Sequence, residues 1–317
     1  MPPTATSSSS TPRLSPQALG WCLGALGVFV FALTIPMTRL ASGSLASPQL
    51  PAVFVAIGRA ALAGLLAALW LLATRANWPR QGQWRQLGLT SLGVVFGFPL
   101  FLGLAVQRVD AAHAAVVSGL LPIATAVIAA LILRQRPSAG FWACAWLGTG
   151  LVLSFAYWKG QAGWQAADAL LLGAVLCGGF GYVMGARMSA PSGDGQPPMP
   201  PQQVISWVLV VCLPVTLPLA WVTWPEAPVR AEAWGGFLYV SIFSVWLGFF
   251  AWYRGLQLGG MMRVSQVQLL QPFLSMLMAV PLLGEPLETA TIGFALAVMA
   301  TVFLSRRMAV VTVAAAR

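Results

Sequence analysis

Charged side chains are scarce in this chain of 317 residues: only 8% are Asp, Glu, Lys or Arg, whereas 58% are hydrophobic. There is a single lysine, Lys159, and a single histidine, His113. A soluble core of this length does not need so many apolar residues, so most of the chain is expected to lie in lipid. The composition therefore predicts an integral membrane protein.

Acidic residues are the scarcest charged ones, since 7 Asp and Glu stand against 17 Lys and Arg, which gives a net charge of +10. In a polar protein this excess would suggest nucleic acid as a partner. Here the arginines stand between apolar spans, where the cytoplasmic loops of membrane proteins carry them. We therefore interpret the positive charge as a signal of membrane topology and expect no nucleic-acid partner.

Motifs of the common enzyme classes are absent as well. One histidine cannot supply the HExxH pair of a metalloprotease, and neither a GxxxxGK[ST] loop nor a Rossmann fingerprint occurs. A dyad of Ser118 and His113 fails, because five residues along one helix place two side chains about 140° apart. The cysteines stand in apolar spans without a CxxC pair and are interpreted as buried thiols: Cys22, Cys144, Cys177 and Cys212. We expect no enzyme, no cofactor and no metal site.

What the sequence does contain is a series of ten apolar spans, each near the ~20 residues that a helix needs to cross hydrocarbon. Spans 1 to 10 cover about 18–38, 51–73, 86–107, 112–133, 138–156, 166–187, 203–222, 233–257, 260–283 and 290–305. The Ser/Thr/Pro-rich residues 1–17 before them are predicted to be a disordered cytoplasmic tail. The fold class that follows is all-α integral membrane, with ten transmembrane helices.

Two stretches repeat one plan at an offset of 150 residues. Residues 109–137 and 259–287 align without a gap, which places Pro122 on Pro272. The offset corresponds to five spans, an odd number, so the two copies are predicted to cross the membrane in opposite senses. Both prolines then fall near the midplane. Inverted repeats with interrupted helices at the midplane are typical of the substrate sites of secondary transporters.

The distribution of positive residues sets the orientation. With the N-terminus inside, twelve arginines lie in inner loops and ends: Arg13, Arg75, Arg80, Arg85, Arg134, Arg136, Arg187, Arg254, Arg263, Arg306, Arg307 and Arg317. The outer side holds only Arg39, Arg108, Lys159 and Arg230. This bias predicts a multi-pass protein of the cell (inner) membrane with both termini in the cytoplasm.

Several stretches resemble the EamA-domain family of the drug/metabolite transporter superfamily, in its ten-helix form. They are FALTIPMTRLA (31–41), FVAIGRAALAGLLA (54–67), LLGEPLETATIG (282–293) and the two proline-centred segments. The resemblance implies a secondary transporter with two five-helix repeats, at 18–156 and 166–307, a linker at 157–165 and a cytoplasmic tail at 308–317. The first copy departs from the family pattern, because Gln135 and its two arginine neighbours replace the usual Gly-Glu.

Span 9 carries the richest candidate site. Gln268, Gln271 and Ser275 lie on one face of a helix, and Pro272 removes the donor that would bind the carbonyl of Gln268. Together they would form an uncharged hydrogen-bonding site for a small-molecule substrate near the middle of the membrane. Alternatively, the glutamines only join neighbouring helices, and Ser275 bonds the backbone of its own helix.

The equivalent positions of span 4 are Ser118 and Pro122, and we include both in the candidate site. His113 and Arg263 are also candidates, because each copy places a basic residue nine positions before its proline.

Two other spans contribute candidates. Arg59 lies about eight residues into span 2, deep for a charge, and is either a substrate-binding group or a structural arginine. Span 8 carries an aromatic stripe at helical spacing: Tyr239, Phe243, Trp246, Phe250 and Tyr253. The stripe either lines a cavity, with Trp246 and Tyr253 as candidates, or faces lipid.

The sequence thus favours a transporter that exports a small metabolite, amino acid or amphiphilic drug by alternating access. The alternative is a membrane channel, facilitator or receptor without coupled transport. Proton coupling stays open, because no carboxylate stands in the middle of a span. His113 has the side chain that titrates near neutral pH, but a histidine at a helix end is also compatible with a purely structural role.

The topology can be tested by cysteine labelling from either side of the membrane. In a variant without the native cysteines, a cysteine at Gly195 should react from the cytoplasm and one at Pro228 from outside. The opposite pattern of labelling would contradict both the orientation and the inverted sense of the repeats.

Overall fold

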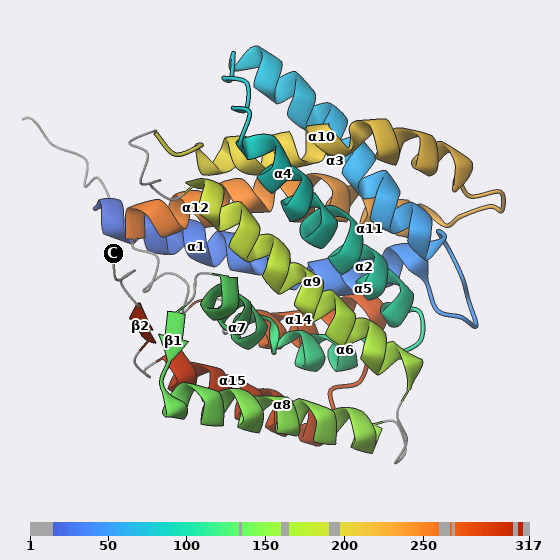
Figure 1. Cartoon of the computed structure of the whole chain (residues 1–317). Coiled ribbons are helices and arrows are strands. Elements are labelled where there is room, and N and C mark those ends of the chain that lie inside the picture. The colour runs from blue at the N-terminus through green and yellow to red at the C-terminus, as the bar shows by residue number, and fades with distance from the viewer. Residues whose placement is uncertain are drawn as a thin grey trace, which may run out of the picture.

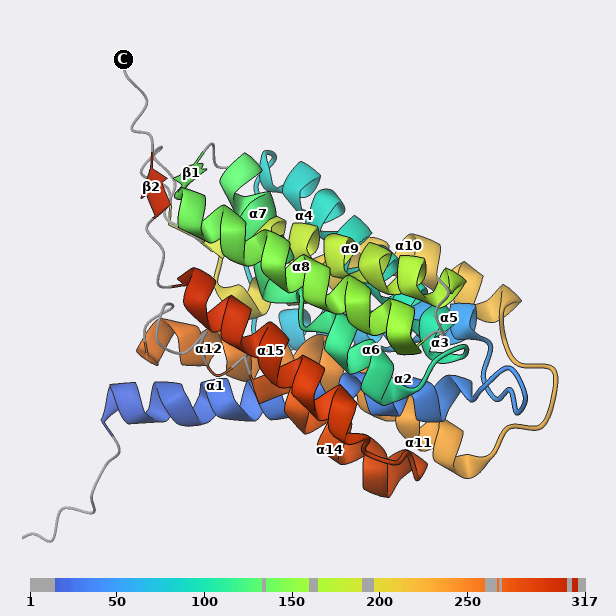
Figure 2. The same cartoon turned by 90° about the horizontal axis from the view of Figure 1, so that it is seen from below.

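The computed structural model of the protein describes residues 15–132, 135–159, 165–189, 197–259, 267, 270–306 and 310–312. Its helices lie side by side in one bundle (Figure 1). Helix α1 begins and helix α15 ends at the same end of this bundle (Figure 2). That arrangement requires an even number of crossings between the two helix ends.

Five of the predicted spans are single helices: α3 (Ala52–Ala73), α8 (Ala139–Lys159), α9 (Ala166–Ser189), α10 (Pro201–Val222) and α15 (Thr289–Arg306), which are spans 2, 5, 6, 7 and 10. Spans 1 and 4 are divided into α1 (Pro16–Ala32) with α2 (Thr34–Ser42), and α6 (Ala111–Ser118) with α7 (Leu121–Ile132). Spans 3 and 8 contain a π-helical segment: α4 (Gln83–Ser91), η1 (Leu92–Gly97) and α5 (Phe98–Val106), then α11 (Ala231–Tyr239), η2 (Val240–Leu247) and α12 (Gly248–Gly259). The described helix of span 9 is α14 (Gln271–Leu283).

The predicted helical membrane fold with ten spans is confirmed. Among the described residues, 7 continuous helical stretches are long and apolar enough to cross a membrane by themselves. Spans 5, 9 and 10 contain shorter apolar helices, at Trp142–Val152, Gln271–Leu283 and Thr289–Thr301. Large apolar side chains cover the outside of the bundle; Trp221, for example, is 83% exposed. A lipid solvent explains this surface, since water would disfavour it.

A short two-stranded ladder was not anticipated from the sequence. Strand β1 (Gln135–Pro137) pairs antiparallel with β2 (Val310–Thr312), with Arg136 opposite Val311. The ladder joins the chain after span 4 to the chain after span 10, at one end of the bundle (Figure 2). It involves residues outside the spans, so the helical membrane class is unaffected.

The helix contacts follow the two repeats. Equivalent helices pack on each other: α3 on α10, α6 on α14 and α8 on α15, which pair span 2 with 7, span 4 with 9 and span 5 with 10. Two further extensive contacts are exchanged between the repeats, because span 1 packs on span 8 and span 3 packs on span 6. A pseudo-two-fold relation between spans 1–5 and spans 6–10 produces this pattern.

Glycines allow the two exchanged contacts to be close. A Cβ added at Gly93 of span 3 would lie 2.7 Å from the Cα of Gly181 in span 6. A Cβ added at Gly255 of span 8 would lie 2.6 Å from the backbone nitrogen of Gly24 in span 1. Both pairs of backbones therefore meet where no side chain intervenes, as is common between membrane helices.

The carboxylate of Glu285 joins the two repeats at the start of span 4. Its two oxygens accept hydrogen bonds from the backbone N–H groups of Ala111 and Ala112, at 2.9 and 3.0 Å. These are donors that the first turn of α6 leaves without an intrahelical partner. Burial raises the pKa of the Glu285 carboxyl, and Asp110 adds to this, whereas the two N–H donors and Arg39 lower it.

Replacing Glu285 should loosen the end of the bundle at which α6 begins. Glu285→Ala leaves two N–H groups without an acceptor, a loss that is typically about 0.5–2 kcal/mol for a helix cap. We expect a lower melting temperature in detergent, with Glu285→Gln between the variant and the parent protein. Glu226→Ala, at an exposed loop position, is the control. Equal melting temperatures for all four proteins would show that the cap contributes nothing to stability.

Candidate functional site

The interruption of span 1 follows from one proline and is compensated by another helix. Pro36 has no N–H group, so the carbonyl of Ala32 loses its intrahelical donor, and α1 ends at Ala32. The hydroxyl of Ser275 in α14 donates a hydrogen bond to this carbonyl. Ser275 therefore joins span 9 to span 1 and does not bond the backbone of its own helix. Thr125, by contrast, donates to the carbonyl of Leu121 in its own helix at 2.7 Å.

The proline-centred segments of the two repeats meet beside this break. Span 4 is interrupted between Ser118, where α6 ends, and Leu121, where α7 begins, and Pro122 is the second residue of α7. In span 9, α14 begins at Gln271 with Pro272 next to it. A Cβ added at Gly119 would lie 3.6 Å from Cγ of Pro272, so the two segments are in contact.

The π-helical segments of spans 3 and 8 lie at equivalent places in the two repeats. The segments η1 and η2 begin at Leu92 and Val240 and end at Gly97 and Leu247, which are the same positions to within a few residues at the offset of 150. Single π-turns within α-helices are frequent at functional sites. The irregular parts of spans 1, 3, 4 and 8 and the first residue of α14 contribute to one cavity.

A cavity lies among these irregular segments. It is lined by Phe31, Thr34, Ile35, Arg59, Val94, Phe98, Ser118, Leu121, Gly178, Tyr182, Ser244, Phe249 and Gln271. Spans 1 to 4 of the first repeat and spans 6, 8 and 9 of the second contribute to it. Equivalent positions face it from both sides, as Val94 and Ser244 do. The space open to the centres of water molecules is about 40 Å³, enough for a few waters but too little for a drug-sized solute.

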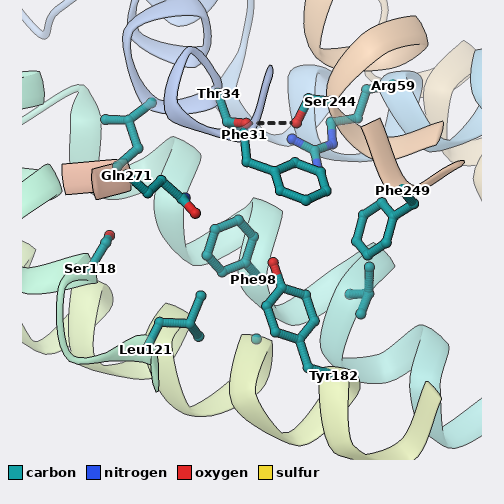
Figure 3. A pocket seen from close by; sticks show the side chains of 13 residues that line it. Phe31, Thr34, Arg59, Phe98, Ser118, Leu121, Tyr182, Ser244, Phe249 and Gln271 are labelled. Carbon is teal, nitrogen blue, oxygen red and sulfur yellow. Dashed lines mark hydrogen bonds between the residues drawn. The ribbon is translucent and has the colours of Figure 1, made fainter. Parts of the chain in front are cut away.

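The lining combines rings with a few polar groups (Figure 3). Four aromatic side chains surround the cavity: Phe31, Phe98, Tyr182 and Phe249. The hydroxyls of Thr34 and Ser244 share a hydrogen bond of 2.7 Å across the contact of spans 1 and 8. The amide of Gln271 and the hydroxyl of Ser118 also face the cavity (Figure 3). Such a surface suits a solute with an apolar body and a small number of polar groups.

Arg59 is the charged residue of this lining. It lies in the middle of α3, and its side chain is 4% exposed. Among the described residues, no acceptor lies within hydrogen-bonding distance of its Nε atom, while the phenol of Tyr182 is close enough to interact electrostatically. The guanidinium is therefore a buried charge at the edge of the cavity (Figure 3).

The structure brings some of the predicted site residues together and leaves others apart. Arg59, Ser118 and Gln271 line the cavity. Pro122 lies at the interruption of span 4, Pro272 lies in the first turn of α14, and Ser275 of α14 donates to the carbonyl at the interruption of span 1. Arg263 and Gln268 lie outside the described residues.

His113 lies near the start of α6 and does not line the cavity. Its Nε2 atom is 2.8 Å from Oδ1 of Asp168 in the first turn of α9, and both side chains are buried. Oδ2 of Asp168 accepts a hydrogen bond from the backbone nitrogen of Gln165 at 3.0 Å. The imidazole ring packs against Phe155 of α8, with 5.2 Å between ring centres. His113 therefore joins spans 4, 5 and 6.

The aromatic stripe of span 8 is not one continuous face. Trp246 donates from its indole nitrogen to the hydroxyl of Ser206, and Tyr253 packs against Phe249. Phe243 is half exposed, whereas Phe249, outside the predicted stripe, lines the cavity. The stripe assumed a regular α-helical period, and η2 changes the rotation per residue within it. Residues after the π-helix therefore face other directions than the pattern predicts.

Ten lining residues were not among the sequence candidates, and only some had a usable signal. Pro36 indicates an interruption one turn earlier in span 1, which would have pointed to Phe31 and Thr34. For Phe98, Tyr182 and Phe249 we find no local signal, because their role depends on which helices meet.

These features define a class: a multi-pass membrane transporter with two repeats around a central cavity. The chain belongs to the EamA-like transporter family, whose model matches residues 18–157 and 165–307. It is 39% identical over 292 residues to the uncharacterized transporter YdeK of Bacillus subtilis (strain 168), with 92% of this chain and 98% of that protein covered. A solved crystal structure shares the fold at a TM-score of 0.60 and 18% identity, covering 92% of this chain and 99% of the other.

Gln271 and Ser275 provide a matched test of the two roles found in span 9. Gln271→Leu should raise the Km for transport with little change in melting temperature, because its amide faces the cavity. Ser275→Ala should lower the melting temperature, because the Ala32 carbonyl loses its donor, typically a loss of about 1–3 kcal/mol for a buried group. A fallen melting temperature with an unchanged Km for Gln271→Leu would assign that residue to helix packing.

Proposed function

We propose that the protein is a secondary transporter that moves a small metabolite, amino acid or amphiphilic drug across the cell (inner) membrane by alternating access. The observation that carries this proposal is the cavity between the two repeats, lined by helices of both and by the interrupted spans 1 and 4. The proposal makes export the direction of transport and places both termini in the cytoplasm. It assigns helices 1–5 to residues 18–156, a linker to 157–165 and helices 6–10 to 166–307.

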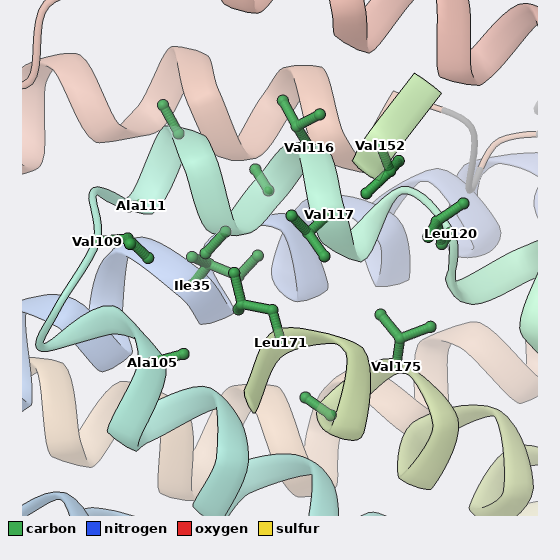
Figure 4. Packing of buried hydrophobic residues seen from close by; sticks show 14 of the residues in the cluster. Ile35, Ala105, Val109, Ala111, Val116, Val117, Leu120, Val152, Leu171 and Val175 are labelled. Atoms are coloured by element: carbon green, nitrogen blue, oxygen red, sulfur yellow. The ribbon is translucent and has the colours of Figure 1, made fainter. Parts of the chain in front are cut away.

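Apolar clusters on both sides of the cavity support an occluded conformation. One cluster surrounds α6 and the start of α9, and includes Ile35, Val117 and Leu171 (Figure 4). A second contains Leu71, near the end of α3, and Trp252, in the first half of α12. A solute larger than a few waters therefore needs one cluster to separate before it enters. Inverted repeats provide two such clusters that open in turn.

We also propose that protons are coupled to transport through the buried pair of His113 and Asp168. Its charged surroundings at the start of α6 are Asp110, which occupies the N-cap position, and the Glu285 carboxylate, which accepts from the first turn. Because α6 ends at Ser118 in the cavity, protonation of the pair acts on a helix that reaches the substrate.

A channel, facilitator or receptor is the competing function. A channel would conduct through an open path and would not saturate. The narrow, closed cavity favours a carrier, because a carrier binds its solute in a space that opens to one side at a time.

Proteoliposomes distinguish these functions. Vesicles with purified protein, preloaded with one unlabelled amino acid or amphiphilic drug at a time, should accumulate the same labelled solute by counterflow. Uptake should saturate with solute concentration. A pH gradient should drive uptake by the parent protein but not by Asp168→Asn. The Asp168→Asn variant should nevertheless keep counterflow. Glu232→Gln, a substitution on the exposed first turn of α11, is the control.

The outcomes separate the proposals. Flux without saturation or counterflow would favour a channel. Gradient-driven uptake that survives Asp168→Asn would contradict the role of the pair while leaving the carrier function intact.

A further inference from the structure

The cavity contains a buried positive charge, Arg59, and none of the described residues that line the cavity supplies an opposite charge. Arg59 lies seven residues after the start of α3, about 10 Å along the helix axis. In the described part of the chain its Nε atom has no hydrogen-bond partner. A charged side chain within a membrane normally pairs with an opposite charge or with carbonyl groups, or it lines a pathway for a substrate.

No carboxylate of the chain lies within the lining. The sequence has 7 acidic residues, and six of them are described. They stand at helix starts or in loops: Asp110, Asp168, Glu226, Glu232, Glu285 and Glu288. Asp194 lies outside the described residues, in the polar stretch between spans 6 and 7. None of the residues that line the cavity is acidic, so an anion that approaches Arg59 would have to come from outside the protein.

The chemistry of the guanidinium indicates which anion. Its planar fork of N–H donors matches a carboxylate with two parallel hydrogen bonds. One buried positive charge compensates one negative charge, and a dianion would leave a second charge unpaired in a site of low polarity. The site therefore suits a monoanion.

The rest of the lining indicates the body of the solute. Rings from Phe31, Phe98, Phe249 and Tyr182 offer a surface for an apolar or aromatic group. Gln271 and Ser118 lie across the cavity from Arg59 (Figure 3), and both are uncharged. A polar group on the far end of the solute would find hydrogen bonds there but no charge.

We infer that Arg59 is the counter-ion of the transported solute, and that the cavity takes a monocarboxylate with an aromatic or apolar body. The inference rests on the proposed transport function and narrows its substrate class. Entry of the carboxylate completes the hydrogen bonding of the guanidinium. It therefore makes the occluded state more favourable with substrate than without it.

The test compares acids with their neutral amides on the unchanged protein. At pH 7.5, purified protein is titrated with phenylacetate, 3-phenylpropionate, indole-3-acetate and octanoate, and with the amide of each. Binding is read from the shift of the melting temperature, and exchange from counterflow in proteoliposomes. We expect at least one acid to bind at least tenfold more tightly than its amide. Amides that bind as well as every acid would overturn the inference.

Substitutions of Arg59 test whether this residue causes the preference for acids over amides. Arg59→Gln should reduce the acid-to-amide ratio to near one and lower transport more than it lowers the yield of folded protein. Arg59→Lys keeps the positive charge and should retain a reduced preference for acids over amides. It serves as the test variant if Arg59→Gln fails to fold. Arg230→Gln, at an exposed position before α11, controls for the loss of one positive charge. An unchanged ratio in folded Arg59→Gln, or loss of folding in both Arg59→Gln and Arg59→Lys, would assign Arg59 to the fold.

Failure of the inferred carboxylate specificity can be distinguished from failure of the proposed transporter function. Counterflow of an amide that does not depend on Arg59 would reject the carboxylate and keep the transporter. Absence of counterflow for every acid, amide, amino acid and drug would reject the proposed carrier itself.

Discussion

The hydrogen bond from Ser275 to the Ala32 carbonyl is the contact on which the cavity depends. In hydrocarbon no water satisfies a backbone group, so each interruption of a helix needs a donor or an acceptor from elsewhere in the protein. Pro36 creates the interruption of span 1, and the second repeat supplies the missing donor. Phe31 and Thr34 line the cavity because the helix breaks beside them. The break in span 1 that lies beside the cavity is therefore also the point at which a hydrogen bond from span 9 links the second repeat to the first.

The distribution of charge follows the same constraint. The described carboxylates lie at helix starts or in loops. Two of them have a clear structural role there, because Glu285 accepts from the backbone of α6 and Asp168 pairs with His113. Arg59 departs from this pattern, because it is buried at mid-span beside the cavity. Among the described residues, the acids are thus separated from the deep cation Arg59, which leaves a place in which a solute can complete the electrostatics.

The repeat explains why residues far apart in sequence take equivalent places. Val94 and Ser244 are 150 positions apart, and both line the cavity from π-helical segments. The pseudo-two-fold relation also makes the close glycine contacts of spans 3 and 6 recur between spans 8 and 1. Where the copies differ, the chemistry differs: Gln271 has Leu121 as its counterpart, so one repeat offers a hydrogen-bonding amide at this position and the other an apolar contact.

The sequence by itself determined the membrane class, the ten spans and the two repeats, because hydrophobic length and proline position are local properties of the chain. It also indicated Arg59 and Gln271, since charges and amides in apolar spans stand out without knowledge of neighbours. Only the tertiary structure decided that Phe98, Tyr182 and Phe249 face one cavity, because helix packing selects which faces meet. It likewise placed His113 in a pair with Asp168 of another helix. It also showed that the aromatic residues of span 8 do not form one stripe, because a π-helix, which the periodicity of the sequence does not reveal, changes the rotation between them.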